Sequence, residues 1–108
     1  MAYPQGAVVI GEDPFGNAPE RPYLLLSNER VPFHGEEYIA AVITTTAREM
    51  AVELTDASFE QGQLPKSSYV SPWSILTLKD WMITKQPAEV TATTVSEVRE
   101  ALNTYLQS

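Results

Sequence analysis

The segment Arg21-Pro22-Tyr23-Leu24-Leu25-Leu26-Ser27-Asn28 decides the fold of this 108-residue chain. An unbroken apolar run such as residues 23–26 predicts a strand that is buried on both faces, or a strand whose outer face is covered by a partner. We expect this strand to span residues 23–27. Arg21 lies just before the start of this strand, and Pro22 restricts the backbone immediately after the arginine. The segment therefore predicts a buried strand with a charged side chain at its entrance.

Strands are also predicted on both sides of this segment. Residues 6–10 (GAVVI) are apolar and β-branched, which is typical of a short buried strand. Residues 11–19 are rich in Gly, Pro, Asn and Asp and predict a mobile surface loop with Phe15 at its tip. Residues 38–46 (YIAAVITTT) have the strongest strand pattern in the chain, and this strand ends in three hydroxyl residues.

The rest of the chain predicts shorter strands and one helix. We expect strands over residues 50–54, 68–71 and 73–78, with a loop over residues 55–66. An amphipathic helix is predicted near the end, because apolar residues recur there at three- and four-residue intervals: Val95, Val98, Ala101, Leu102 and Tyr105. Thr94 or Ser96 can cap its first turn. The expected fold is mostly β, with a C-terminal α-helix packed on a small barrel.

Composition limits the number of domains and the environment of the chain. With 44% hydrophobic residues, the chain fits a single domain that covers residues 1–108. No run reaches the roughly 20 apolar residues of a membrane span, and the N-terminus lacks the pattern of a signal peptide. The absence of cysteine excludes disulfides and thiolate metal sites. We expect a cytoplasmic protein without membrane contact.

Acidic residues outnumber basic residues by 14 to 7, which gives a formal net charge of -7. This charge opposes a broad phosphate-binding surface, although a local cluster of a few basic groups can still bind nucleic acid. An acidic surface is typical of a high-salt cytoplasm and also of ordinary acidic bacterial proteins, and composition does not separate the two.

Two interpretations of Arg21 follow from the residues alone. A guanidinium group binds phosphate bidentately and stays charged, so Arg21 can stabilise charge that develops on a phosphate oxygen. Alternatively, it forms a surface ion pair with neighbouring Glu20. The cluster Thr44, Thr45 and Thr46 is similarly ambiguous: its hydroxyls can bond a phosphate, but β-branched residues also suit a strand, and residue chemistry favours the structural role.

Other polar residues favour structural roles. His34 is the only histidine, which excludes a nuclease built on a histidine pair, and its turn-rich surroundings favour an exposed loop residue over a proton shuttle. The pairs Glu12-Asp13 and Glu36-Glu37 are more typical of solvated loops than of metal ligands. We expect neither a metal nor another cofactor.

The order of these features resembles the PemK/MazF family of toxins. The matching elements are Gly-x-Val-Val at residues 6–9, a flexible loop, and Arg-Pro at residues 21–22 followed by an apolar strand that ends in Ser-Asn. Residues 39–44 (IAAVIT) look like the family's third strand with its threonine, and residues 62–70 (GQLPKSSYV) look like the loop and strand that follow. The resemblance covers nearly the whole chain.

This resemblance implies a small SH3-like barrel of the CcdB/Kid/MazF type that forms a homodimer and cuts single-stranded RNA without a metal. It also implies a cognate antitoxin, which silences the toxin and binds DNA together with it. By resemblance, Arg21 and Thr44 occupy the catalytic positions. Five further residues are expected to contact the substrate: Glu20, Pro22, Thr45, Ser68 and Trp73. The loop expected to gate RNA or antitoxin binding carries Asp13, Phe15 and Asn17.

The implied reaction is attack of an RNA 2′-hydroxyl on the adjacent phosphate, which leaves a 2′,3′-cyclic phosphate and a free 5′-hydroxyl. The need for the 2′-hydroxyl would discriminate against DNA. Arg21 would stabilise charge and can act as an acid toward the leaving oxygen, while Thr44 would orient the phosphate. An antitoxin tail is expected over Phe15, Pro22 and Trp73.

Two departures from the family pattern leave alternatives open. Several family members carry a glutamate where this chain has residues 16–18, and Ser71-Pro72-Trp73 stands where some relatives have charged or amide residues. Base recognition should therefore differ. The alternatives are a non-catalytic barrel resembling the gyrase-poisoning toxins and a degenerate toxin that only binds a partner.

Overall fold

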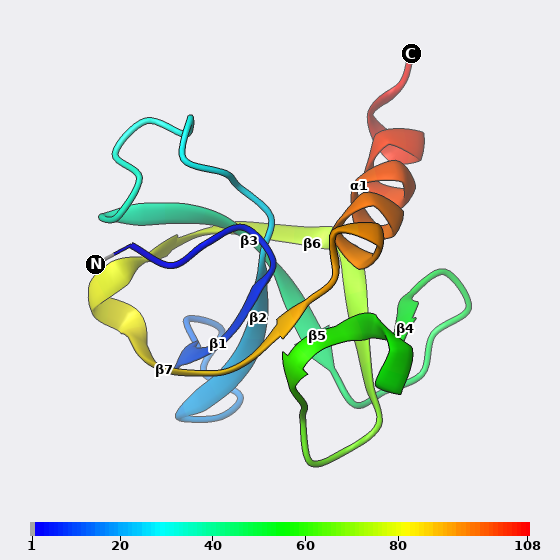
Figure 1. Ribbon diagram of the computed structural model, residues 1–108, viewed down its shortest axis with the longest axis horizontal. Helices are drawn as coiled ribbons and strands as arrows, with labels where there is room; N and C mark the ends of the chain where they lie inside the picture. Colours follow the sequence, from blue (N-terminus) through cyan, green and yellow to red (C-terminus); the bar gives the residue numbers. More distant parts are fainter. Residues whose placement is uncertain (1) are drawn as a thin grey trace.

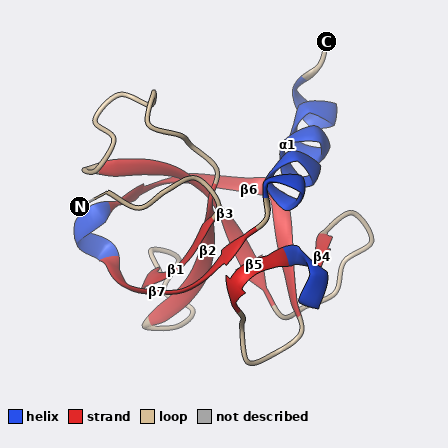
Figure 2. Ribbon diagram, in the orientation of Figure 1, coloured by secondary structure: helices blue, strands red, loops and turns tan. Residues whose placement is uncertain are grey.

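In residues 2–108, which the computed structural model describes, seven strands curl into a nearly closed barrel and one long helix follows them (Figures 1 and 2). The strands are β1 (Ala7–Glu12), β2 (Glu20–Leu25), β3 (Glu37–Thr44), β4 (Val52–Leu54), β5 (Phe59–Gly62), β6 (Ser68–Lys79) and β7 (Ile83–Val90). The short 3-10 helices η1 (Asp56–Ser58) and η2 (Asp80–Met82) precede β5 and β7, and α1 spans Ala92–Leu106.

All strand pairs are antiparallel, and the strand order is β4-β6-β3-β2-β1-β7-β5. The edge strands β4 and β5 are consecutive in the chain and are joined only by η1 and one residue before it, so the sheet must bend until its edges approach each other. The backbone N–H of Thr91 donates to the carbonyl of Ser58 at 2.9 Å, which ties the start of α1 to this corner. The predicted barrel with a C-terminal helix is confirmed.

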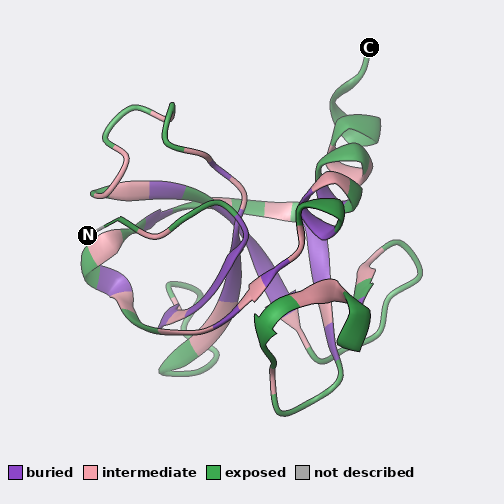
Figure 3. Cartoon of the chain, in the orientation of Figure 1, coloured by how far each residue is buried: buried purple, intermediate pink, exposed green. Residues whose placement is uncertain are grey.

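The central strands β1, β2 and β3 are buried on both faces (Figure 3). Val8 pairs with Leu24, and both belong to one apolar cluster that also contains Val98 of α1. The neighbouring pair, Val9 and Tyr23, belongs to a second cluster on the opposite face. Alternation along a strand sends successive side chains to opposite faces, so a continuous apolar run fills both clusters. The expected two-sided burial of β2 is confirmed.

Strand β2 begins earlier than expected, at Glu20. Residues 20–22 pair with residues 10–12 of β1. This pairing also extends β1 past Gly11. Arg21 is therefore the second residue of a strand, and the connecting loop is limited to residues 13–19. Two strands of a hairpin continue as long as their backbones can pair. The turn-forming composition of residues 11–19 did not reveal that the pairing reaches residues 11 and 12.

Strand β6 is one strand where two were predicted. Its pairing with β3 steps from Ile75 opposite Ala41 to Ser71 opposite Val42, so residues 72–74 are additional on the β6 side. Pro72 lies in this irregularity, where its missing N–H breaks no regular ladder. The predicted break between residues 71 and 73 is therefore a bulge, and the bulge carries Trp73.

Two strands were not predicted. β5 lies inside the predicted loop 55–66, and β7 lies in a segment of mixed polarity that contains Lys85, Gln86 and Pro87. Both are defined by their partners, because β7 pairs with β1 and β5 pairs with β7. A strand that owes its existence to a distant partner need not have an apolar pattern of its own.

The predicted amphipathic helix is confirmed, but its cap is not. Thr91 is the N-cap, and its Oγ1 accepts from the backbone N–H of Thr94 at 3.1 Å. Thr94 is buried inside the first turn and donates from its own Oγ1 to the carbonyl of Ser58. Val95 and Val98 face the barrel. No helix among residues 2–108 is long and apolar enough to cross a membrane.

Candidate functional site

Arg21 extends from β2 toward the end of the neighbouring strand β3. Its Nη2 donates to the carbonyl of Ile43 at 3.3 Å, and its Nε is buried without a hydrogen-bond partner. Among the described residues, the one ion pair joins Lys79 and Glu37, so Arg21 has no carboxylate partner. The side chain is thus oriented by a neutral carbonyl while its charge stays unneutralised.

Thr44 is the last residue of β3 and lies next to this guanidinium. Tyr23 pairs with Val42, and continuing the same antiparallel register by two residues places Arg21 opposite Thr44. On its other side, Thr44 pairs with Tyr69 of β6. The Thr44 Oγ1 accepts from the backbone N–H of Thr46 at 3.1 Å, which ends the strand in a turn. The predicted strand to residue 46 is therefore two residues too long.

Two surface hollows meet at Arg21 and Thr44, and both residues line each of them. The first hollow has a volume of about 290 Å³, and its other lining residues are Phe15, Val42, Arg48, Ser71, Trp73 and Ser74. The second hollow has a volume of about 260 Å³, and its other lining residues are Asp13, Asn17, Ala18, Pro22, Ile43, Thr45 and Ser68. Residues from β2, β3, β6 and two loops therefore converge around one guanidinium and one hydroxyl.

The loop over residues 13–19 is organised by one carboxylate. Asp13 accepts from the backbone N–H of Phe15 at 2.8 Å with Oδ1 and from that of Ala18 at 3.1 Å with Oδ2. Both carboxylate oxygens are thus used to hold the loop, a local arrangement that aspartate favours in turns. Phe15 lies at the rim of the first hollow and remains 56% exposed.

Most residues singled out in the sequence come together here. Nine of them line one or both hollows: Asp13, Phe15, Asn17, Arg21, Pro22, Thr44, Thr45, Ser68 and Trp73. Ser68 is buried, and its hydroxyl donates to the carbonyl of Lys66 at 2.8 Å, so its proton is already engaged.

Glu20 is the exception, because it lines neither hollow. Its carboxylate accepts from Thr84 Oγ1 of β7 at 2.9 Å. Successive residues of a strand point to opposite faces, so the side chain next to Arg21 in sequence is directed away from it. The structure gives no support to Glu20 as a substrate contact or as the ion-pair partner of Arg21.

Arg48 was missed by the sequence argument. It lies on the loop between β3 and β4 and lines the first hollow together with Arg21. It is one of seven basic residues in an acidic chain, and it follows Thr44 by four positions, which was the available signal. Ser71 also lines the first hollow, although it was named from the sequence only as part of the Ser71-Pro72-Trp73 departure and not as a site residue.

Two tyrosines of the core donate hydrogen bonds and have raised pKa values. Tyr23 donates to the carbonyl of Glu12 at 2.7 Å, and burial, reinforced by the charge of Asp13, raises its pKa to about 12. Tyr38 donates to Asp80 Oδ1 at 2.9 Å, and burial is also the main cause of its raised pKa.

His34 packs edge-on against Tyr38, so it is not the fully exposed loop residue that was expected.

The chain is similar to solved structures of toxins. An endoribonuclease in complex with its cognate antitoxin, from Mycobacterial species, matches with a TM-score of 0.78 and 27% identity over 97% of this chain and 95% of that one. An endoribonuclease from Mycobacterial species matches with a TM-score of 0.77 and 26% identity over 98% and 92% of the two chains.

A MazE-MazF structure from Deinococcus radiodurans matches with a TM-score of 0.75 over 98% of this chain and 96% of that one, and its 23% identity supports the fold alone. No protein-family model matches the sequence, and no curated protein matches it. The likeness therefore lies in the three-dimensional arrangement more than in the residues, and the resemblance expected from the sequence is confirmed at that level.

Proposed function

Because the chain has the fold of the MazF toxins and resembles the PemK/MazF family, we propose that it is the toxin of a type II toxin-antitoxin system and cleaves single-stranded RNA. The observation that carries this proposal is the meeting of two hollows at Arg21 and Thr44. A phosphate bound there would have room for one nucleotide on each side.

In the proposed reaction, the RNA 2′-oxygen forms a bond to the adjacent phosphorus, and the bond from phosphorus to the 5′-oxygen breaks. Arg21 has no carboxylate partner among the described residues, and its guanidinium stabilises the negative charge that builds on the phosphate oxygens. It is not the base, because a guanidinium stays protonated in proteins. Thr44 bonds and orients the phosphate from the neighbouring strand end.

Within residues 2–108, Asp13 is the one carboxylate that lines either hollow, but it is not assigned to proton transfer. Both of its oxygens accept backbone N–H groups of its own loop. The 2′-hydroxyl proton is therefore assigned to solvent, and the leaving 5′-oxygen takes a proton from water. In this proposal the chain's contribution is position and charge stabilisation.

The test compares wild type with Arg21→Ala in a cleavage assay on single-stranded RNA that contains EDTA. We expect a loss of about 10²–10³-fold, the effect of removing one preorganised charge-stabilising group. Arg99→Ala is the control, because Arg99 is an exposed residue of α1 that lines neither hollow. Products of the wild type should end in a 2′,3′-cyclic phosphate. Cleavage that survives Arg21→Ala unchanged would overturn the assignment.

The net charge of -7 favours a second candidate, a non-catalytic barrel that acts by binding a partner. In that case the induced protein arrests growth while cellular RNA stays intact, and broken DNA would indicate a gyrase-type target. Cleavage of RNA by the purified chain at low and moderate salt would exclude this candidate.

We also propose that the chain forms a homodimer and binds a cognate antitoxin. The first solved structure described above is an endoribonuclease with its cognate antitoxin. In this chain Phe15 and Trp73 are 56% and 40% exposed at the rim of the first hollow, and Pro22 lines the second. An apolar antitoxin tail over these residues fits a strongly acidic toxin, which offers few basic groups for charge attraction. A pull-down unchanged by Phe15→Ala and Trp73→Ala would contradict this placement.

A further inference from the structure

Arg48 and Trp73 line two adjoining hollows on the side of the site away from Asn17 and Thr45. Both residues line the first hollow, and both also line a neighbouring hollow of about 370 Å³ with Glu49, Met50 and Tyr105. A cation and an aromatic ring therefore lie beside each other, along a path that leads away from Arg21 and Thr44.

We propose that Arg48 and Trp73 form a nucleotide-binding subsite next to the scissile phosphate. Arg48 binds the phosphate that neighbours the one held by Arg21, and Trp73 stacks on a base. This inference rests on the proposed function, because it places the substrate of that same site.

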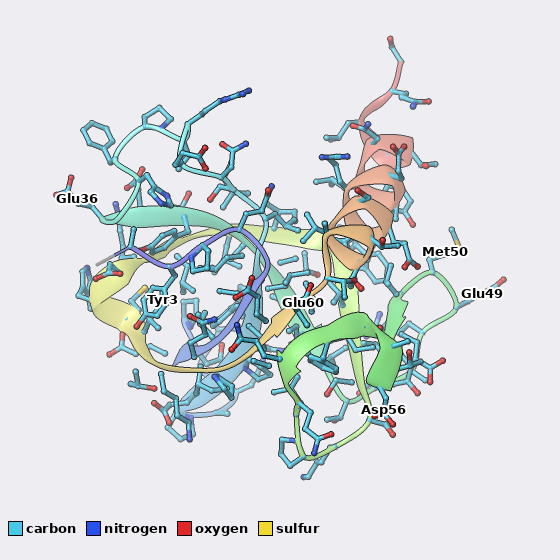
Figure 4. The ribbon with its side chains drawn as sticks, in the orientation of Figure 1. Tyr3, Glu36, Glu49, Met50, Asp56 and Glu60 are labelled. Carbon is cyan, nitrogen blue, oxygen red and sulfur yellow. The ribbon has the colours of Figure 1, made fainter. Side chains whose placement is uncertain are left out.

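The surroundings of Arg48 leave its charge available. It is exposed, it takes part in no ion pair of the described residues 2–108, and its side chain has no hydrogen bond among them. The adjacent Glu49, labelled in Figure 4, also lines the neighbouring hollow, but it forms no ion pair with Arg48 among the described residues. The chain has seven basic residues and a net charge of -7, so two arginines that form no ion pair with any described residue concentrate positive charge in one hollow.

Trp73 is positioned as a platform by the bulge of β6 and by the helix. The additional residues 72–74 turn it outward, where it is 40% exposed, while Pro72 beneath it is buried. Tyr105 of α1 meets the indole edge to face, with ring centroids 6.3 Å apart and an interplanar angle of 88°. A ring held in this way can stack on any base, since every base has a π-face.

The two sides of the site therefore differ in what they can recognise. The second hollow offers the amide of Asn17 and the hydroxyl of Thr45, which can distinguish base edges by hydrogen bonds. The Arg48–Trp73 subsite offers a charge and a ring, which bind phosphate and base without distinguishing sequence. We therefore place affinity, and not base selectivity, in this subsite.

The test measures binding of single-stranded RNA that is methylated at every 2′-oxygen and cannot be cleaved by the proposed reaction. Fluorescence anisotropy over a series of salt concentrations gives the slope of log K against log salt. Arg48→Gln should reduce the magnitude of this slope by about 0.7, the value for one phosphate contact on a single strand. Arg99→Gln removes the same charge from α1 and should leave the slope unchanged.

Trp73→Leu should weaken binding about tenfold, equally for oligonucleotides of different base composition, and Trp73→Phe should retain part of the affinity. A wild-type slope for Arg48→Gln, or a Trp73→Leu effect that depends on base identity, would overturn the proposal. If wild type binds the methylated RNA with these mutational effects but cleaves no RNA, the catalytic function fails and the subsite stands. If Arg21→Ala abolishes cleavage while Arg48→Gln changes neither slope nor KM, the subsite fails and the function stands.

Discussion

The guanidinium of Arg21 is hydrogen-bonded to the carbonyl of Ile43, the residue that precedes Thr44. The end of β3 thus orients the positive charge of Arg21 and also supplies the hydroxyl of Thr44. A small change in the position of β3 moves both groups together, which preserves their relative geometry. Preorganisation of this kind is what electrostatic stabilisation of a transition state needs.

Cleavage should depend on the hydroxyl of Thr44 more than on the volume of the Thr44 side chain. Thr44→Val keeps the shape but removes the hydroxyl that orients the phosphate, and we expect kcat/KM to fall by about 10²-fold. Thr44→Ser should retain most of the activity. Thr46→Val is the matched control, because Thr46 contributes only its backbone N–H to this turn. Equal activities of Thr44→Val and Thr46→Val would contradict the role of Thr44.

Stability should fall at alkaline pH because of Tyr23. Its folded-state pKa of about 12 lies above the ordinary value of 10.0, so the folded state keeps the phenol neutral where the unfolded chain ionises. The stabilisation is complete below pH 10 and is lost as the pH rises from 10 to 12. Urea midpoints measured from pH 8 upward should show this decline.

Tyr23→Phe is expected to reduce that decline without abolishing it, because the pKa of Tyr38 is raised as well. The variant also loses the hydrogen bond to the Glu12 carbonyl, which should cost about 1 kcal/mol at pH 8. An alkaline decline as steep as that of wild type would show that Tyr23 is not its source.

Gly62→Ala should destabilise the barrel more than Gly16→Ala. Both glycines have positive φ, 68° and 78°, so each substitution carries a backbone cost of about 1 kcal/mol. A Cβ at Gly62 would also lie 2.2 Å from the carbonyl oxygen of Pro87, whereas a Cβ at Gly16 meets nothing within 4 Å. We therefore expect a total loss above about 3 kcal/mol for Gly62→Ala in urea unfolding. Similar losses for the two variants would show that β7 can yield at Pro87.

Local patterns predicted the elements that carry their own signal. The apolar runs of β1, β2 and β3 and the periodicity of α1 mark these elements, because burial on one or both faces demands such residues. The edge strand β5 and its neighbour β7 are polar and exposed enough to resemble loops. Their conformation depends on pairing with residues far away in the chain, which no local window contains.

The site residues also divide into those that were predicted and those that only the tertiary structure revealed. Arg21 and Thr44 were singled out through the resemblance to the PemK/MazF family, and both are at the meeting point of the hollows. Glu20 was expected there because it is adjacent to Arg21 in sequence, but strand alternation turns it toward Thr84. Arg48 reaches the site through the loop that follows β3, and the path of that loop could not be derived from its turn residues.

The order of residues was thus sufficient for a mostly β fold with a terminal helix and for an arginine next to a buried strand, because these follow from short-range hydrophobic patterning. The partners of that arginine were decided only by the tertiary structure. The register between β2 and β3 sets Arg21 opposite Thr44, and the bulge in β6 turns Trp73 outward beside Arg48. Register and bulges arise from pairing across the whole sheet, so the chemistry of the site depends on contacts between residues that are far apart in the sequence.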